Sequence, residues 1–469
     1  MGTLVMKFGG TSVGSVEALT SAVDIVMHYK KDWERLAVVV SAMSGVTNLL
    51  IEGARTAEAG NEERYQAIHA ELIERHVDVV ETLIKDEGTR QSLQAQTEEL
   101  LEEFTTLCYS VHVLGEATPR AMDTISSLGE RINARVVAAL IGERSQPSEA
   151  VESTELVITD NKFQDAVPQM EITCKRVKAR LDPLLKKGVI PVVTGFMGAT
   201  EDGAITTLGR GGSDFSAAIL GDCLNADEVW TWTDVDGVMS ADPRLVDNAV
   251  VIPELSYSEV SELAYYGAKV LHPKTIRPIV ERGIPLWVKN TFNPDYPGTL
   301  IIPDPKNGNG NVKAISAIHD LSMITVEGMG MLGVPGIAAR TFSAVARQEV
   351  SVLMISQASS EQSISFIIPM GAVKQVLAAV EDEMAVELAR RDIDRIWSMD
   401  EVVIITAVGA GLRSTPGIAA RIFGALGSAK INVIAIAQGS SECGLSFLVA
   451  ATDAARAVQS IHEEVIVNG

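Results

Sequence analysis

The sequence has few of the residues that mark several common classes of protein. Its four cysteines (Cys108, Cys174, Cys223 and Cys443) lie far apart with no paired spacing. Such spacing is typical of neither a zinc site nor a disulfide framework, and it predicts a reducing, cytoplasmic setting. Lys and Arg total 39 against 61 Asp and Glu, and the net charge of −22 argues against partners such as nucleic acid or an anionic membrane surface.

Long apolar runs are also absent, since none approaches the ~18 residues that a membrane span needs. The first residues lead directly into an expected strand and lack the layout of a signal peptide. What remains is an ordinary globular composition, 46% hydrophobic and 21% charged over 469 residues. A chain of this length is expected to form about three domains with sizeable cores.

The most informative stretch is Gly209–Ser216, which reads Gly-Arg-Gly-Gly-Ser-Asp-Phe-Ser between an expected strand and an expected helix from Phe215. Three glycines let backbone N–H groups close on an anion, and Ser213 or Asp214 is expected to cap the helix. Arg210 is suited to clamp a substrate carboxylate, and Asp214 to hold a metal ion or orient a lysine. The alternative is a tight turn in which Arg210 and Asp214 pair with each other.

A second glycine-rich turn follows the first expected strand, which covers residues 4–8. Lys7 stands just before Gly9 and Gly10, and Ser12 follows them. A lysine at the end of a strand beside glycines can reach a bound phosphate as a point charge. The alternative is an edge-strand lysine that extends along the surface into solvent.

Three polar side chains elsewhere are candidates for contact with a ligand. Ser41 and Thr47 follow a strand expected at residues 36–40, where hydroxyls are well placed to bind a ligand, although such residues are more often helix caps. Glu130 follows Gly129 within a segment expected to be helical from about residue 61 to 140. A glycine inside a helix usually has a packing reason. Glu130 is suited to accept hydrogen bonds from an ammonium group, or to pair with a neighbouring arginine.

After a linker rich in proline, asparagine and glycine, at residues 294–310, the chain repeats itself. The stretch Gly328–Arg340 recurs as Gly409–Arg421, an offset of 81 residues. Each copy reads strand, glycine-rich loop, helix, strand, turn, strand, helix, which predicts two duplicated α+β modules. The second copy lacks a final strand, and an unpaired sheet edge is a liability. We therefore expect a strand at residues 311–318 to complete the second module.

Taken together, these motifs resemble those of the aspartate kinases. The similarity extends in family order from residue 5 to about 447, through Lys7–Ser12, Ser127–Arg131, Thr194–Gly198, Gly209–Ser216, Trp232–Gly237 and Gly267–Pro273. It implies an α/β amino-acid-kinase fold, an open and mostly parallel sheet between helix layers, at residues 1–305. Two α+β ACT modules would follow at 320–400 and 401–469, the second completed by strand 311–318.

The resemblance implies transfer of the ATP γ-phosphoryl group to the side-chain carboxylate of L-aspartate, forming 4-phospho-L-aspartate. This is the first step of lysine, threonine and methionine biosynthesis. Mg²⁺ would be carried by the ATP phosphates. Some family members continue into a homoserine dehydrogenase, but this chain ends at Gly469, so we expect a monofunctional enzyme.

The family pattern also implies roles for individual residues. Lys7 and Asp214 would act in catalysis, Arg210 would bind the α-carboxylate, Glu130 the α-ammonium, and Ser41 and Thr47 would hydrogen-bond the substrate. The nucleotide side would be formed by Gly9, Gly10, Ser12, Gly211, Gly212, Thr233, Asp234, Asp242, Arg244 and Lys269. Some family members have a tyrosine at the position of Met239, so the adenine contacts stay open.

The ACT pair implies a homodimer or higher homo-oligomer and a feedback effector, and the sequence resembles the threonine-sensitive type. The effector residues would be Gly330, Gly336, Gln357, Gly411, Gly417 and Gln438. The neutral amide of glutamine can donate a hydrogen bond to the hydroxyl of threonine and accept one from it. A bound lysine would instead need a carboxylate facing its ammonium, because burying an unpaired charge is costly. The alternatives are another small-molecule kinase of the same fold, acting on glutamate, acetylglutamate or a nucleotide, and a non-catalytic amino-acid sensor.

Overall fold

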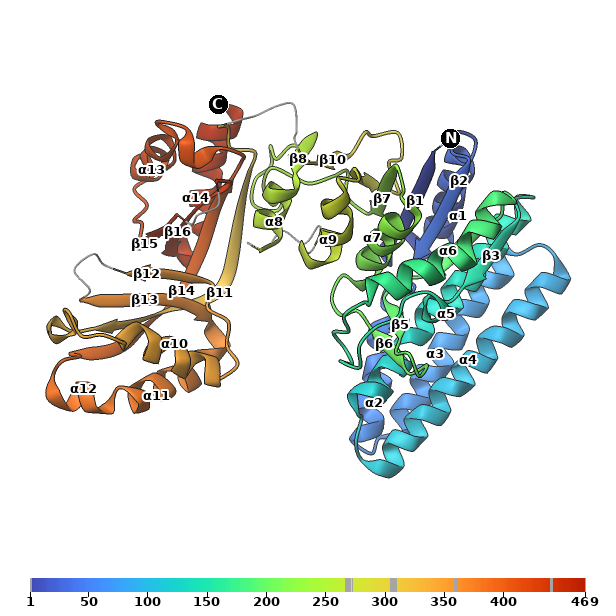
Figure 1. Cartoon of the computed structure of the whole chain (residues 1–469), viewed down its shortest axis with the longest axis horizontal. Coiled ribbons are helices and arrows are strands. Elements are labelled where there is room, and N and C mark those ends of the chain that lie inside the picture. The colour runs from blue at the N-terminus through green and yellow to red at the C-terminus, as the bar shows by residue number, and fades with distance from the viewer. Residues whose placement is uncertain are drawn as a thin grey trace. The chain divides into compact units, whose positions relative to one another are not determined.

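The computed structural model describes residues 2–265, 271, 273–303, 310–357, 362–438 and 442–468. It divides into two compact units (Figure 1). The first contains residues 1–238, 251–257 and 270–305, and the second contains residues 239–250, 258–269 and 306–469. None of the helices in the described ranges has the length and hydropathy that a membrane span requires.

The first unit is built on an eight-stranded sheet of order β3-β4-β2-β1-β7-β9-β10-β8. All neighbouring strands are parallel except β9 and β10. The strands are β1 (Thr3–Phe8), β2 (Arg35–Val40), β3 (Ser148–Val151), β4 (Ile190–Thr194), β7 (Glu228–Thr233), β8 (Glu254–Ser256), β9 (Leu286–Asn290) and β10 (Thr299–Ile302). All six residues of β1 are buried, as expected for a central strand covered on both faces.

Strand order reverses at β1, which has β2 on one side and β7 on the other. In open α/β sheets a ligand binds beyond the carboxyl ends of the strands at such a point. A short hairpin of β5 (Met197–Ala199) and β6 (Ile205–Thr207) leads from β4 to the glycine-rich loop. The topology therefore brings Lys7, Ser41 and the glycine-rich loops toward one edge of the sheet.

Helices form the layers around this sheet: α1 (Val16–Tyr29), α2 (Val46–Glu58), α3 (Glu62–Leu83), α4 (Glu87–Leu114), α5 (Pro119–Glu143), α6 (Met170–Lys186), α7 (Gly212–Leu224) and α9 (Pro273–Arg282). Another helix, α8 (Tyr257–Tyr265), spans the division between the units. The helical region expected at 61–140 is confirmed as α3, α4 and α5, each begun by a polar cap: Asn61, Asp86 and Thr118. The long helices α3 and α4 run side by side (Figure 1).

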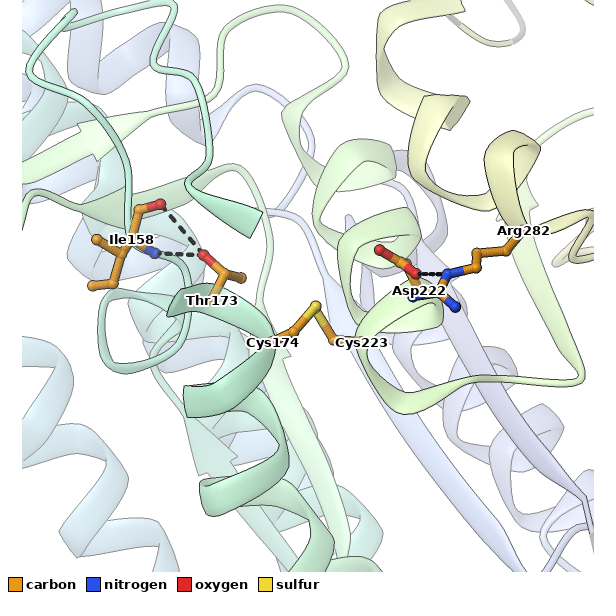
Figure 2. Close-up of a disulfide and its surroundings, with 6 residues drawn as sticks. All are labelled: Ile158, Thr173, Cys174, Asp222, Cys223 and Arg282. Carbon is orange, nitrogen blue, oxygen red and sulfur yellow. Dashed lines mark hydrogen bonds and ion pairs between the residues drawn. A yellow bond between two sulfur atoms is a disulfide. The ribbon is translucent and has the colours of Figure 1, made fainter. Parts of the chain in front are cut away.

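The expectation of four unpaired cysteines is wrong for two of them. Cys174 on α6 and Cys223 on α7 form a disulfide with Cα atoms 4.6 Å apart (Figure 2). Cys108 and Cys443 are buried and are not part of this disulfide. Residues 49 positions apart meet here only because the two helices pack against each other, which spacing along the chain cannot reveal. The cysteine argument for a reducing cytoplasm therefore loses its basis.

The second unit contains a six-stranded antiparallel sheet of order β12-β13-β11-β14-β16-β15. Its strands are β11 (Ala314–Glu327), β12 (Met354–Gln357), β13 (Ser363–Pro369), β14 (Arg395–Val408), β15 (Ala435–Ala437) and β16 (Gly444–Ala450). In β11, residues 314–318 pair with 408–404 of the second copy, and residues 323–327 pair with 399–395. The strand that precedes the first copy thus pairs with the second copy, as the sequence predicted.

The duplication is preserved in detailed contacts. Phe342 packs edge-to-face on Phe366 with ring centroids 5.7 Å apart, and Phe423 packs in the same way on Phe447, also at 5.7 Å. The helices are α10 (Ile337–Arg347), α11 (Val373–Glu383), α12 (Ala385–Arg390), α13 (Ile418–Ser428) and α14 (Ala454–His462). Figure 1 shows α10, α11 and α12 together on one side of the first copy's strands. Both copies therefore have the same strand-and-helix core.

Candidate active site

Lys7 and Asp214 form an ion pair where the two glycine-rich loops meet. Lys7 lies near the carboxyl end of β1 and is 7% exposed, and its Nζ is 2.7 Å from Oδ1 of Asp214, in the first turn of α7. Because β1 is a central strand, the interpretation of Lys7 as a solvent-facing edge lysine is wrong. The pairing of Arg210 with Asp214 is also wrong, because Asp214 contacts Lys7 instead.

The loop that carries Arg210 is held in a shape that glycine permits. Gly209 and Gly211 have φ angles of +75° and +73°, where a side chain is strained. A Cβ on Gly212 would lie 2.8 Å from the Phe196 ring. Helix α7 begins at Gly212 with Gly211 as its N-cap, so the expected start at Phe215 and the expected side-chain cap are wrong. The N–H groups at the start of this helix favour an anion.

The first glycine-rich turn is anchored to the ends of the neighbouring strands. Gly9 donates its N–H to the carbonyl of Trp232 at 3.1 Å, and a Cβ on Gly10 would lie 3.2 Å from the carbonyl of Ala42. The buried Ser12 hydroxyl donates to the Trp232 carbonyl at 3.2 Å and accepts from Thr291 at 2.7 Å. The Ser12 side chain therefore holds the turn in place.

Glu130 is a buried carboxyl with an unused oxygen. Its side chain is 3% exposed, and Oε2 has no hydrogen-bond partner within the described residues. Burial raises the pKa of Glu130 to about 8, although the hydrogen bond that its carboxylate accepts from the Ala42 N–H acts in the opposite direction. A Cβ on Gly129 would lie 2.7 Å from the Cβ of Ala42, which confirms the predicted packing reason for that glycine. The neighbouring Arg131 pairs with Glu152 instead of Glu130.

Sequence reasoning missed Asn133, which lies one helical turn after Glu130 on α5. Its side chain is fully buried, and its Nδ2 donates to the Ser41 carbonyl at 2.6 Å. Its Oδ1 is buried without a partner in the part of the chain that the structure describes. Buried polar atoms in native proteins are normally hydrogen-bonded, so two open acceptors one turn apart indicate a place for a donor-rich ligand. The i, i+3 spacing from Glu130 was the available signal.

The remaining substrate candidates lie nearer to solvent. Ser41 directly follows β2, donates its N–H to the Phe8 carbonyl at 3.2 Å and is half-buried, as is Thr47 in the first turn of α2. Arg210 is exposed, and no ion pair or hydrogen bond holds its guanidinium among the described residues. An unpaired guanidinium beside an anion-favouring loop is available for a substrate carboxylate.

The nucleotide candidates fall into three groups. Thr233 ends β7 and donates to the exposed Asp234 at 3.1 Å. Asp242 and Arg244 belong to the second unit and pair with each other, with Nη2 and Oδ2 2.7 Å apart, and this contact lowers the pKa of Asp242. Lys269 lies outside the described residues. The nucleotide roles of all these residues stay predictions.

A resident metal ion would need several ligands from the protein. Within the described ranges, no group of three His, Cys, Asp or Glu side chains is arranged to hold one. Asp214, already in contact with Lys7, and the exposed Asp234 are single carboxylates. Mg²⁺ held mainly by phosphate oxygens, the mode in which this ion usually accompanies nucleotides, stays a prediction.

Comparison with known proteins agrees with this arrangement. The model of the amino acid kinase family matches residues 2–290, and the ACT domain model matches residues 324–384 and 405–465. The chain belongs to the amino acid kinase family. Within that family it groups with the aspartokinases: Aspartokinase 1, chloroplastic, of Arabidopsis thaliana is 32% identical over 100% of this chain and 81% of its own length.

Other relatives in the family are longer. Bifunctional aspartokinase/homoserine dehydrogenase 1, chloroplastic, of Zea mays is 37% identical over 98% of this chain and 50% of its own length. The chain thus spans about half the length of the bifunctional relatives that it matches. The expectation of a monofunctional enzyme stays a prediction.

Solved structures of E. coli aspartokinase III have the same fold. The complex with aspartate and ADP (R-state) matches with a TM-score of 0.81 at 28% identity, covering 99% of both chains. The complex with lysine and aspartate (T-state) matches with a TM-score of 0.79 at 30% identity, again over 99% of both chains. The predicted α/β amino-acid-kinase fold followed by ACT modules is therefore confirmed.

Proposed function

We propose that this protein is an aspartate kinase, which transfers the γ-phosphoryl group of ATP to the side-chain carboxylate of L-aspartate. The observation that carries the proposal is the ion pair of the buried Lys7 with the half-buried Asp214, which joins two glycine-rich loops at the switch point of the sheet. Relatives support it, since E. coli aspartokinase III is known in complex with aspartate and ADP. The further roles in lysine, threonine and methionine synthesis follow from the same product.

The reaction requires charge stabilisation more than acid–base chemistry. A carboxylate oxygen of aspartate attacks the γ-phosphorus, the bond from that phosphorus to the bridging oxygen breaks, and ADP leaves. The nucleophile is already ionised at neutral pH, so the protein must position two anions and reduce their repulsion. Lys7 stabilises the transferring group, Asp214 orients Lys7, and the N–H groups at the start of α7 bind phosphate oxygens. Mg²⁺ supplies additional positive charge on the phosphates when bound.

Aspartate recognition divides between two elements. Arg210 on the glycine-rich loop binds the α-carboxylate, and Glu130 on α5 binds the α-ammonium. Asn133 supplies a second buried acceptor one turn away. Ser41 and Thr47 add hydrogen bonds from the neighbouring strand end and helix. An ammonium group with three donors can satisfy both open acceptors, which removes the cost of leaving them unpaired.

The proposal is tested by an ATP-dependent aspartyl-hydroxamate assay. We expect hydroxamate formation with aspartate and much less with glutamate, N-acetylglutamate or a nucleoside monophosphate. A preference for one of those acceptors would identify a different kinase of the same fold. Binding of aspartate without any turnover would instead identify an amino-acid sensor.

Glu130 gives the reaction a specific pH dependence. Because its pKa in the free protein is about 8, Glu130 is mostly neutral at lower pH, and only its ionised form attracts an ammonium. We expect kcat/KM for aspartate to rise about 20-fold from about pH 6.5 to about pH 8.5. Glu130→Gln should remove this rise, whereas the exposed Glu63→Gln should keep it. A wild-type profile that is flat across this range would contradict the role of Glu130.

For the effector, we propose threonine bound at the ACT modules. A pocket of about 370 Å³ in the first module is lined by Met331, Gly333, Val334, Pro335, Gly336, Ile337, Ala338, Gln357 and Ile364. Its described lining includes no charged side chain, which suits a neutral amino acid better than lysine. Gly336 is the N-cap residue of α10 with a φ of +92°, and Gly417 is the N-cap residue of α13 with a φ of +89°.

The other effector candidates are less uniform. Gly330 is packed against Asp392, where a Cβ would lie 2.6 Å from its Cα, so that glycine serves close packing. Gly411 has a φ of +75° in the matching loop of the second copy, and Gln438 is exposed just after β15. Glu442 is exposed, as expected, and Glu361 lies outside the described residues. Lysine, seen in complex with E. coli aspartokinase III, is the competing effector.

Titration with threonine, lysine and methionine tests the effector. We expect inhibition by threonine, with a midpoint about tenfold higher when both Gln357 and Gln438 are replaced by alanine, because a hydrogen bond to the hydroxyl is lost. Since an effector acts through unequal affinity for two states, threonine should also weaken aspartate binding. The exposed Gln375→Ala on α11 serves as control. Inhibition by lysine alone, or an unchanged threonine midpoint in the double variant, would contradict the assignment.

The remaining expectations are also proposals. We infer domain boundaries at 1–305, 320–400 and 401–469, supported by the family matches, although residues 239–250 and 258–269 are compact with the second unit. Homodimer or higher association through the ACT modules is supported by exposed apolar side chains at the edge strands and the effector loop: Ile355, Ile436, Met329 and Leu332. A cytoplasmic location stays a prediction.

A further inference from the structure

Helix α5 carries a second buried carboxylate, Asp123, on the same face as Glu130. The two residues are seven positions apart, which corresponds to two helical turns, and both are almost fully buried at 1% and 3% exposed. Removing a carboxylate from water is costly unless the protein hydrogen-bonds it fully. Whatever Asp123 binds is therefore held firmly to this helix.

Asp123 accepts three hydrogen bonds, all from the chain around the glycine-rich loop. The N–H of Thr207 donates to Oδ2 at 2.9 Å, and its hydroxyl donates to Oδ1 at 2.8 Å. The N–H of Gln164 donates to Oδ2 at 2.9 Å. Thr207 is the last residue of β6 and lies three residues before Arg210. The Asp123 carboxylate thus binds both the backbone and the side chain of Thr207, at the start of the glycine-rich loop.

The segment around Gln164 supports the same loop from a second direction. The N–H of Ala166 donates to the Thr207 carbonyl at 2.9 Å, and a Cβ on Gly209 would lie 3.1 Å from the Gln164 carbonyl. Gln164 itself has a φ of +69°, unusual for a residue with a side chain, which its hydrogen bond to Asp123 helps to hold. Asp123 is therefore the point at which α5, β6 and this segment are joined.

We propose that Asp123 is a positioning residue for the amino-acid substrate. Through Thr207 it fixes the position of Arg210 relative to Glu130, so that these two side chains can bind the α-carboxylate and the α-ammonium of the same substrate molecule. The inference rests on the proposed aspartate kinase function. Asp123 contacts no reacting atom; it ties the loop that binds one end of the substrate to the helix that binds the other end.

The test is the steady-state kinetics of Asp123→Asn. Asparagine has nearly the same shape, but its amide presents N–H donors to groups that are themselves donors, so the loop base loses part of its anchor. We expect KM for aspartate to rise about tenfold, with KM for ATP changed less than about twofold and kcat within about threefold. The exposed Asp78→Asn on α3 is the matched control and should match the wild type.

A second variant acts from the other side of the contact. Thr207→Val removes only the hydroxyl donor to Asp123 and keeps the backbone N–H, so we expect a smaller rise in KM for aspartate, about threefold. In the double variant the two effects should not add, because both changes remove parts of one contact. If Asp123→Asn fails to fold, the result for Thr207→Val decides the proposal.

The outcomes distinguish a failure of the proposed function from a failure of the positioning role of Asp123. A wild-type protein without aspartate-dependent turnover would overturn the proposed function and this role with it. An active wild type, with KM for aspartate unchanged in the variants, would overturn only the positioning role. A lowered melting temperature with unchanged KM for aspartate would show that the Asp123 contact is purely structural, and it would also overturn the proposal.

Discussion

Replacing Lys7 by alanine is expected to reduce kcat by about 10²- to 10³-fold, the usual cost of removing one electrostatic group from a phosphoryl- or acyl-transfer site. Lys7 is buried beside Asp214, and its ammonium is the positive charge on β1 at the meeting point of both glycine-rich loops. The loss should fall on kcat more than on KM for aspartate, because the charge that Lys7 stabilises develops during transfer. Steady-state hydroxamate kinetics measure both parameters.

The matched control for Lys7 is Lys31→Ala, an exposed lysine in the same unit. Thermal unfolding checks that the loss is not a folding defect. A useful companion is the double replacement Lys7→Ala with Asp214→Asn, which removes the carboxylate that Lys7→Ala leaves unpaired. If this double variant folds as stably as the wild type but still lacks turnover, the low kcat of Lys7→Ala is a catalytic effect. A Lys7→Ala protein with normal kcat would remove Lys7 from the mechanism.

Replacing Arg210 by alanine should have the next largest effect, on KM for aspartate. A two-pronged guanidinium–carboxylate contact is worth about 2–4 kcal/mol when broken, so KM should rise about 30- to 1,000-fold. Stability should change little, because Arg210 is exposed and holds no hydrogen bond or ion pair within the described chain. Arg210→Lys should recover only part of the loss, since an ammonium keeps the charge but lacks the planar fork.

An arginine on the surface of the same unit provides the comparison for Arg210. Arg277 is 78% exposed in its side chain and pairs with Glu281, so Arg277→Ala should leave both kinetic constants unchanged. Isothermal titration with aspartate alone then separates binding from turnover. Near-normal aspartate affinity in Arg210→Ala would place the α-carboxylate elsewhere.

Local sequence determined much of the architecture of this protein. Buried strands and glycine-rich turns are specified by short stretches, so Lys7, Gly9, Gly10 and the Gly209–Gly212 loop could be recognised without coordinates. The duplication at an offset of 81 residues predicted that the strand near residue 314 pairs with the second copy, and the register of β11 with β14 agrees. Periodicity carries this information because each module repeats one hydrophobic pattern.

Tertiary structure alone decided which side chains meet. The partner of Asp214 is Lys7, 207 residues away, rather than the nearby Arg210, and the disulfide joins cysteines on two packed helices. The start of α7 also depended on packing, because Gly212 lies against Phe196 and the helix begins there, three residues before the expected Phe215.

The state of buried polar groups was likewise invisible in the sequence. Glu130 was recognised as a candidate, but its raised pKa comes from its burial on α5. The sequence does not single out Asn133 and Asp123, because a polar residue in a helical segment is usually exposed to solvent. Spacing along a chain indicates which residues share one face of a helix. Burial and hydrogen-bond partners depend on which other elements pack against that face. Burial and partners in turn determine the protonation state of each polar group and the groups that it can contact.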